Sequence, residues 1–168
     1  RCSATRHIAQ VSRRTVTDAV YHGRLELDSH ADTIVFGKNF AILQYTEREC
    51  NVSPYTDAYE AIKNVPIVSG GTAYTNQTSG ETFILVFHEG LWMGDQMENS
   101  LLNPNQLRHF GVTVQDNPFS SVPLHMAMED SSFIMPLAML GTIVTAQTRT
   151  PTQEELDTCR KVVLSSKH

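Results

Sequence analysis

The amino-acid sequence predicts a mainly β fold with one or two short helices, and three observations lead to this prediction. Short runs of apolar and β-branched residues recur along the 168-residue chain, separated by Gly, Asn or Ser-Pro turn signals. The most apolar run, residues 83–87, is continuous, as is typical of strands buried on both faces. Only residues 103–111 and 150–159 carry clear signals for the start of a helix.

The predicted strands are the segments rich in Val, Ile, Thr and aromatic residues, which have high β propensity. Gly70-Gly71 and Gly80 predict turns. Pro136 places its strand at a sheet edge, because proline cannot donate a hydrogen bond to a neighbouring strand. In chain order the predicted strands cover residues 24–27, 33–36, 40–46, 62–68, 82–88, 112–114, 122–128 and 133–144, preceded by an extended arm or edge strand over 8–20.

Two short helices have recognisable ends. Asn103 is suited to be the N-cap of the first, Pro104 its first residue, and Gly111 the residue that ends it. The segment Thr150-Pro151-Thr152-Gln153 fits a capping box for a second helix that runs to Cys159. These signals predict where the chain leaves its strands.

Composition excludes several classes of partner. The formal net charge is −5 with a pI near 5.8, whereas nucleic-acid binding requires a basic surface, so we expect no nucleic-acid partner. No apolar run approaches the roughly 18 residues of a membrane span, and we expect no membrane partner. Because the first residue is Arg1 and no signal-peptide pattern follows, we expect a processed piece of a longer polypeptide.

The three cysteines do not form a disulfide framework, since their number is odd and their spacing is wide. Cys2, Cys50 and Cys159 are interpreted first as unpaired thiols. One disulfide and one free thiol is the alternative in an oxidising compartment. No Cys-x-x-Cys pair suggests zinc, and no cofactor is expected.

The segment 25–36 carries the main functional signal. An apolar strand delivers Asp28 and Ser29 into a tight turn, and a second apolar run follows at once, which is the layout of the catalytic loop in aspartic proteases. Such enzymes need two facing carboxylates that share one proton. One motif per chain supplies half of this pair, so Asp28 would meet its own copy in a homodimer. The other Asp-Ser segment, 130–132, lacks the apolar strand before it.

Two blocks extend this signal: residues 25–33, Leu-Glu-Leu-Asp-Ser-His-Ala-Asp-Thr, and residues 99–111, Asn-Ser-Leu-Leu-Asn-Pro-Asn-Gln-Leu-Arg-His-Phe-Gly. With them, and with the later stretch 141–152, the chain resembles the protease segment of copia-type retrotransposon polyproteins. The resemblance implies a retropepsin-like closed or half β-barrel, a polypeptide substrate and a cytoplasmic virus-like particle. It implies catalytic roles for Asp28 and Ser29.

The same resemblance assigns the remaining site residues and the domain boundaries. Residues 1–23 would be an N-terminal extended arm, 24–118 the retropepsin-like domain, and 119–168 a β-rich extension ending in a short helix. His30, Ala31, Asp32 and Thr33 would shape the catalytic loop. Leu101, Leu102 and Asn103 would form the second apolar crossing of the fold, with Asn103 in place of the usual Gly.

His30 departs from the Asp-Ser-Gly wording of the family. A histidine at this position needs room for its side chain, and we expect it to crowd the carboxylate pair or to change its pKa. The alternation of Asp28, His30 and Asp32 also suggests a metal site, provided that the segment is extended. Our interpretation places these residues in a turn and therefore includes no metal.

A second function belongs to another class of protein. The same fold without peptidase activity could be a structural subunit of a self-assembled oligomer or filament, joined through exposed strand edges. In that case the location would be extracellular, and the Asn-x-Ser/Thr triplets at Asn76 and Asn51 would be candidate glycosylation sites. In both interpretations the partner is a second copy of the chain.

Overall fold

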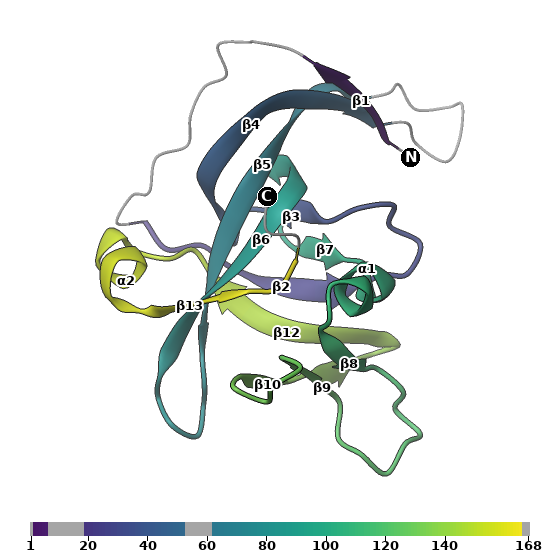
Figure 1. Ribbon diagram of the computed structural model, residues 1–168, viewed down its shortest axis with the longest axis vertical. Helices are drawn as coiled ribbons and strands as arrows, with labels where there is room; N and C mark the ends of the chain where they lie inside the picture. Colours follow the sequence, from purple (N-terminus) through teal and green to yellow (C-terminus); the bar gives the residue numbers. More distant parts are fainter. Residues whose placement is uncertain (1, 7–18, 53–61, 166–168) are drawn as a thin grey trace.

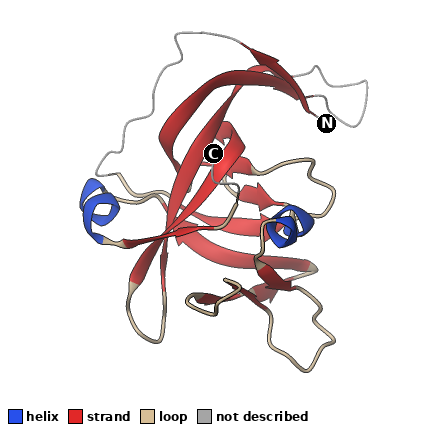
Figure 2. Ribbon diagram, in the orientation of Figure 1, coloured by secondary structure: helices blue, strands red, loops and turns tan. Residues whose placement is uncertain are grey.

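The computed structural model describes residues 2–6, 19–52 and 62–165. Their fold is mainly β with two short helices, which confirms the predicted fold class at this level (Figures 1 and 2). The predicted arm over 8–20 falls almost entirely outside the described residues. The strands are β1 (Cys2–Arg6), β2 (His22–Leu27), β3 (Val35–Gly37), β4 (Ala41–Val52), β5 (Ile62–Thr75), β6 (Thr82–Gly94), β7 (Ser100–Leu102), β8 (Thr113–Gln115), β9 (His125–Ala127), β10 (Ile134–Pro136), β11 (Ala138–Leu140), β12 (Ile143–Arg149) and β13 (Arg160–Val163).

The strand pairings of the larger sheet close on themselves. They run from β5 through β12, β2, β7, β3 and β6, and β6 then pairs with β5 again. We call this closed set of strands the ring. Strands β4 and β1 extend it beyond β5, while β13 lies along β6 (Figure 1). A separate sheet has the order β10-β9-β8, so Pro136 does lie on an edge strand, as predicted.

Two predicted turns have different outcomes. Gly80 lies in the turn between β5 and β6, where its N–H donates to the Asn76 carbonyl over 2.8 Å. Gly70-Gly71 instead lies inside β5, so that turn prediction was wrong. A Cβ at position 70 would lie 3.0 Å from the buried Phe36 ring, which shows that glycine here allows close packing rather than a change of direction.

Aromatic side chains fill the ring. Phe36, Phe40 and Phe87 are fully buried, with ring centroids 4.6 Å apart between the first two and 5.7 Å apart between the last two. Burial of a side chain of this size stabilises the fold by roughly 1.5–3 kcal/mol. The apolar run 83–87 on β6 is buried as predicted, because both faces of this strand are covered.

A buried polar network joins distant strands of the ring. The Asn39 side chain accepts a hydrogen bond from the Ser100 hydroxyl over 2.6 Å and donates one to Thr148 Oγ1 over 2.8 Å. Ser100 Oγ in turn accepts from the Gly37 N–H over 2.8 Å. Because every member has a partner, the network ties the turn after β3 to β7 and β12 without leaving an unpaired buried group.

Helix α1 (Pro104–His109) has the predicted ends. The side chain of Asn103 caps its first turn, Pro104 is its first residue, and Gly111 follows it with φ of +86°. The cap satisfies N–H groups that have no partner within the helix. The sequence signals alone were sufficient here because capping is a local interaction.

Helix α2 (Gln153–Thr158) has a capping box, but two residues later than predicted. The box consists of Thr152 and Glu155, because Thr150 is already bonded to Tyr21: its Oγ1 accepts from the Tyr21 N–H over 2.8 Å. Glu155 also forms a two-bond ion pair with Arg149, at 2.6 and 2.5 Å. The Arg149 hydrogen bonds are the main cause that lowers the pKa of Glu155 to about 2.

Residues 119–165 supply strands to the sheet that also holds residues 24–118. Strand β12 is antiparallel to β2 from His22 to Glu26, and β13 is parallel to β6. The final described residues continue this contact, since the Leu164 N–H donates to the Val86 carbonyl over 2.9 Å. The predicted boundary near residue 118 therefore falls between segments that share one sheet.

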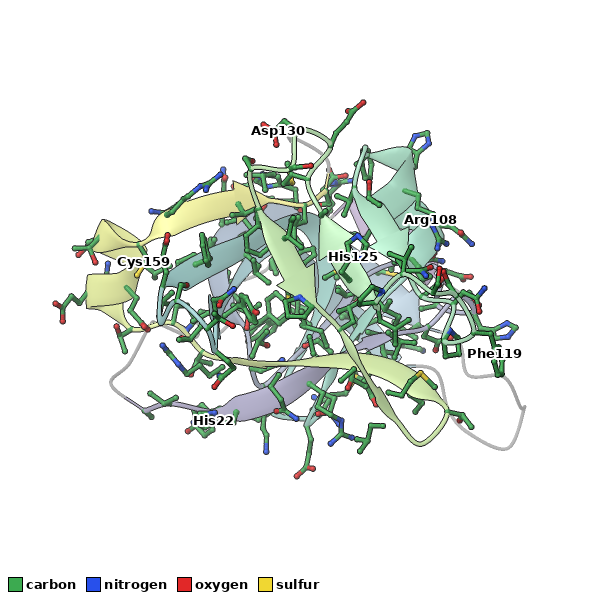
Figure 3. All side chains as sticks on the ribbon, turned by 90° about the horizontal axis from the view of Figure 1, so that it is seen from below. His22, Arg108, Phe119, His125, Asp130 and Cys159 are labelled. Carbon is green, nitrogen blue, oxygen red and sulfur yellow. The ribbon has the colours of Figure 1, made fainter. Side chains whose placement is uncertain are left out.

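The cysteines are not all free. Cys50 is disulfide-bonded, so the first interpretation of three unpaired thiols was wrong, while Cys159 is a free thiol at the end of α2. Figure 3 labels Cys159 beside the helix. Neither helix of the described chain is long and apolar enough to cross a membrane.

Candidate active site

Asp28 follows directly after β2, where this strand lies parallel to β7. Leu27 is opposite Leu102 in the register, and the Asp28 N–H donates to the Leu102 carbonyl over 2.9 Å. Leu101 lies beside Val35 of β3 on the other edge of β7. The structure thus brings the Asp28 loop (residues 28–33) against residues 101–103. No local sequence pattern in either segment predicts this contact.

The loop folds around the Asp28 carboxylate. The His30 N–H donates to Asp28 Oδ1 over 2.9 Å, and the Ala31 N–H donates to the Asp28 carbonyl over 3.3 Å. Asp28 is half-buried, so its carboxylate is held by the backbone while retaining access to solvent. A backbone donor on one carboxylate oxygen fixes the orientation of the group.

His30 stands where the Asp-Ser-Gly motif of aspartic proteases has glycine, and its backbone is not strained. In the described chain the non-glycine residues with positive φ are Glu47, Asn64, Glu89 and Ser131, and His30 is not among them. Its side chain is exposed. The expectation that His30 crowds the carboxylate pair or changes its pKa concerns the dimer and stays a prediction. Within the chain, the hydrogen bond between the two residues uses the His30 backbone N–H.

Asn103 connects the loop to helix α1. Its Nδ2 donates to the Ala31 carbonyl over 2.7 Å, and its Oδ1 accepts from the N–H groups of Asn105 and Gln106 over 2.8 and 3.2 Å. The motif that the sequence resembles has a glycine at this position, and a glycine has no side chain to make these contacts. The amide contact with Ala31 is a feature that sequence reasoning missed.

The other loop residues surround this arrangement. Ser29 is exposed, and its hydroxyl makes no hydrogen bond within the described chain. Asp32 is exposed, whereas Ala31 and Thr33 are half-buried. The Ser29 hydroxyl is therefore available to a second molecule.

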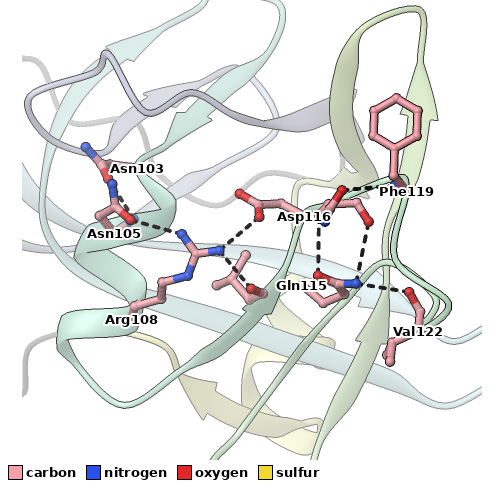
Figure 4. Close-up of polar contacts among 9 residues, drawn as sticks. Asn103, Asn105, Arg108, Gln115, Asp116, Phe119 and Val122 are labelled. Atoms are coloured by element: carbon pink, nitrogen blue, oxygen red, sulfur yellow. Dashed lines mark hydrogen bonds and ion pairs between the residues drawn. The ribbon is translucent and has the colours of Figure 1, made fainter.

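Helix α1 is itself anchored by Arg108, which sequence reasoning did not single out (Figure 4). Its guanidinium donates to Asn105 Oδ1, to the Val114 carbonyl and to Asp116 Oδ1, each over 2.9 Å. These contacts attach the helix to β8.

Asp130 does not provide the second carboxylate. It lies on an exposed turn between β9 and β10, two strands of the separate sheet, and Figure 3 labels it. The Ser132 side chain and N–H hold its pKa below the usual range. The pairing of Asp28 with its own copy in a second chain stays a prediction.

The backbone of residues 28–33 does not have the extended conformation that a metal site at Asp28, His30 and Asp32 would require. Residues 28–33 form a turn rather than a strand, so Asp28, His30 and Asp32 do not share one face. Across the described residues there is no group of three His, Cys, Asp or Glu side chains that could hold a metal ion.

The two candidate glycosylation residues are both partly buried. Asn76 starts the turn between β5 and β6, where its Oδ1 accepts from the N–H groups of Thr78 and Ser79 over 2.8 and 3.0 Å. Asn51 lies in β4 and accepts from the Asn64 N–H over 3.1 Å. The residues that follow Asn76 in its turn, 77–81, are exposed.

Comparison of the chain with protein-family models, with curated proteins and with solved structures found no match.

Proposed function

We propose that this chain is an aspartic endopeptidase domain of a retrotransposon polyprotein and acts as a homodimer with one Asp28 from each subunit. The observation that carries the proposal is the Asp28 carboxylate itself. Asp28 directly follows a ring strand that pairs with β7, its own N–H donates to the Leu102 carbonyl, and its Oδ1 accepts from the His30 N–H. The resemblance of the two sequence blocks to copia-type proteases supports the same assignment.

The chemistry requires two such carboxylates on a two-fold axis. Two carboxyl groups about 3 Å apart cannot both be ionised, so the pair shares one proton. The ionised Asp28 takes a proton from a water molecule, which then attacks the scissile carbonyl carbon, while the protonated Asp28 of the other subunit polarises the carbonyl oxygen. We expect the exposed Ser29 hydroxyl to form a hydrogen bond across the dimer.

The partners and location follow from this proposal. The substrate is an extended polypeptide, and the partner is a second copy of the chain. The cellular location is a virus-like particle in the cytoplasm. No nucleic acid, membrane or cofactor takes part in the proposed reaction.

One observation favours the second candidate, a structural subunit of an oligomer or filament. Strand β11 is a sheet edge on which all three residues are exposed, with Met139 at 40% and Leu140 at 52%. An exposed apolar edge is suited to pairing with another chain. An extracellular location and modification at Asn76 belong to this candidate.

Peptide cleavage between pH 3 and 7 tests the choice. Wild type should cut members of a peptide library, and Asp28→Asn should abolish cleavage because an amide cannot share the proton. Asp157→Asn, on the exposed face of α2, is the matched control and should cleave as wild type does. Absence of cleavage by wild type at concentrations where the chain self-associates would favour the structural candidate.

A further inference from the structure

The side chain of Asn103 is unusual in having both ends of its amide occupied by backbone. Two N–H groups, from Asn105 and Gln106, donate to Oδ1. Because backbone N–H groups are donors only, they require the oxygen to face the helix. The nitrogen must then face the Ala31 carbonyl, where the distance is 2.7 Å. The hydrogen-bond network thus determines the orientation of this amide.

Residues 102 and 103 hold the Asp28 loop at two points. The Leu102 carbonyl accepts from the Asp28 N–H, and Asn103 Nδ2 donates to the Ala31 carbonyl, three residues further along the loop. His30 lies between these two points. A shift of Ala31 away from Asn103 would therefore move the His30 N–H away from Asp28 Oδ1.

We propose that Asn103 is a positioning residue for Asp28, acting through the Ala31 carbonyl. The role of this residue in catalysis rests on the proposed function, but its effect on the loop does not. Where the aspartic-protease motif has a glycine, the Asn103 side chain connects the loop to α1. Its contribution to catalysis is to keep the His30 N–H aligned with the Asp28 carboxylate.

Two substitutions separate this role from helix capping. Ser and Asp are both good N-cap residues, so Asn103→Ser and Asn103→Asp keep the acceptor that α1 needs. The Ser side chain is too short to reach Ala31. The Asp carboxylate places an acceptor against the Ala31 carbonyl at neutral pH, and only its protonated form can donate there.

Amide hydrogen exchange at His30 and Ala31 tests the effect on the loop directly. At pH 7 we expect both variants to exchange these amides about tenfold faster than wild type, the effect of losing one hydrogen bond, with nearly unchanged melting temperatures. At pH 4 the excess over wild type should persist in Asn103→Ser and shrink in Asn103→Asp. Exchange equal to wild type in Asn103→Ser would overturn the proposal.

The pH dependence is assigned by comparing the two variants. Both keep every other ionisable group on the segments that meet at position 103, so a pH dependence confined to Asn103→Asp comes from the new carboxyl. These groups are Asp28, His30, Asp32, Arg108 and His109.

Cleavage kinetics test the consequence for the enzyme. We expect Asn103→Ser to lower kcat about 10²-fold at all pH values, because a misplacement of about 1 Å costs that much. Asn103→Asp should recover activity toward pH 4. A normal kcat in both variants, despite faster exchange, would contradict the catalytic part. If wild type does not cleave, the proposed function fails, and the exchange measurement still decides the role of Asn103 in the loop.

Discussion

The backbone N–H of His30 donates a hydrogen bond to Oδ1 of Asp28 over 2.9 Å. The contact uses no atom of the imidazole, which is exposed. Any residue with a backbone N–H and an ordinary φ at this position can therefore orient the carboxylate. A histidine at this position is therefore compatible with the proposed aspartic protease.

This relationship predicts opposite results for two substitutions of His30. His30→Gly keeps the backbone N–H and should keep kcat within about twofold of wild type. Substitution of an exposed side chain usually changes the free energy of unfolding by less than about 0.5 kcal/mol, so the loop should stay folded. His30→Pro removes the N–H and should lower kcat about 10²-fold or more, as loss of a preorganised donor does. Peptide cleavage at the pH optimum measures both. Equal activity of the two variants would show that the hydrogen bond has no role.

A second prediction concerns the ion pair between Arg149 and Glu155, which joins β12 to α2. The folded-state pKa of Glu155 is about 2, below the ordinary value of 4.5. A lowered pKa adds stability that is present above pH 4.5 and is lost as the pH falls toward 2. We expect Glu155→Gln to lower the free energy of unfolding by about 1–2 kcal/mol at pH 7, after allowance for solvent screening, and by much less near pH 2.

Urea unfolding at a series of pH values measures this difference. Glu154→Gln is the matched control, because Glu154 lies in the same turn of α2 but is exposed and forms no ion pair with a described residue. A Glu155→Gln deficit that is independent of pH would contradict the electrostatic explanation.

A third prediction follows from the position of β12 in the ring. A chain that ends at residue 118 would lose β12 and leave β2, the strand that leads to Asp28, without its antiparallel neighbour. Such a strand exposes unpaired backbone groups and apolar side chains. We expect this truncated chain to lack cooperative unfolding in urea and to lack cleavage, whereas a chain ending at Ser165 should show both. Cooperative unfolding of the shorter chain would mean that 24–118 is an independent domain.

The features that the sequence predicted are those decided by local interactions. The ends of α1 follow from Asn103, Pro104 and Gly111, and the buried strand β6 follows from the apolar run 83–87. The contact between the Asp28 loop and residues 101–103 was not predicted, since no pattern within either segment indicates the other. The mainly β class needed no more than composition and periodicity.

The features that the sequence missed depend on contacts between distant segments. Gly70-Gly71 resembles a turn in the sequence, but the pair lies inside β5, where a Cβ at position 70 would meet Phe36 and one at position 71 would meet Leu43. Thr150 resembles an N-cap, but Tyr21 occupies its hydroxyl from more than a hundred residues away. The insertion of β12 beside β2 and the contact between Asn103 and Ala31 are long-range in the same sense.

The central claim is that two chains share one active site, and mixing subunits tests it most directly. Wild type is refolded together with increasing proportions of Asp28→Asn, and peptide cleavage is measured at constant total chain concentration. If each site needs one Asp28 from each chain, activity falls as the square of the wild-type fraction, to about one hundredth at one part in ten. A linear fall, to about one tenth, would contradict the shared site and show that each chain acts alone.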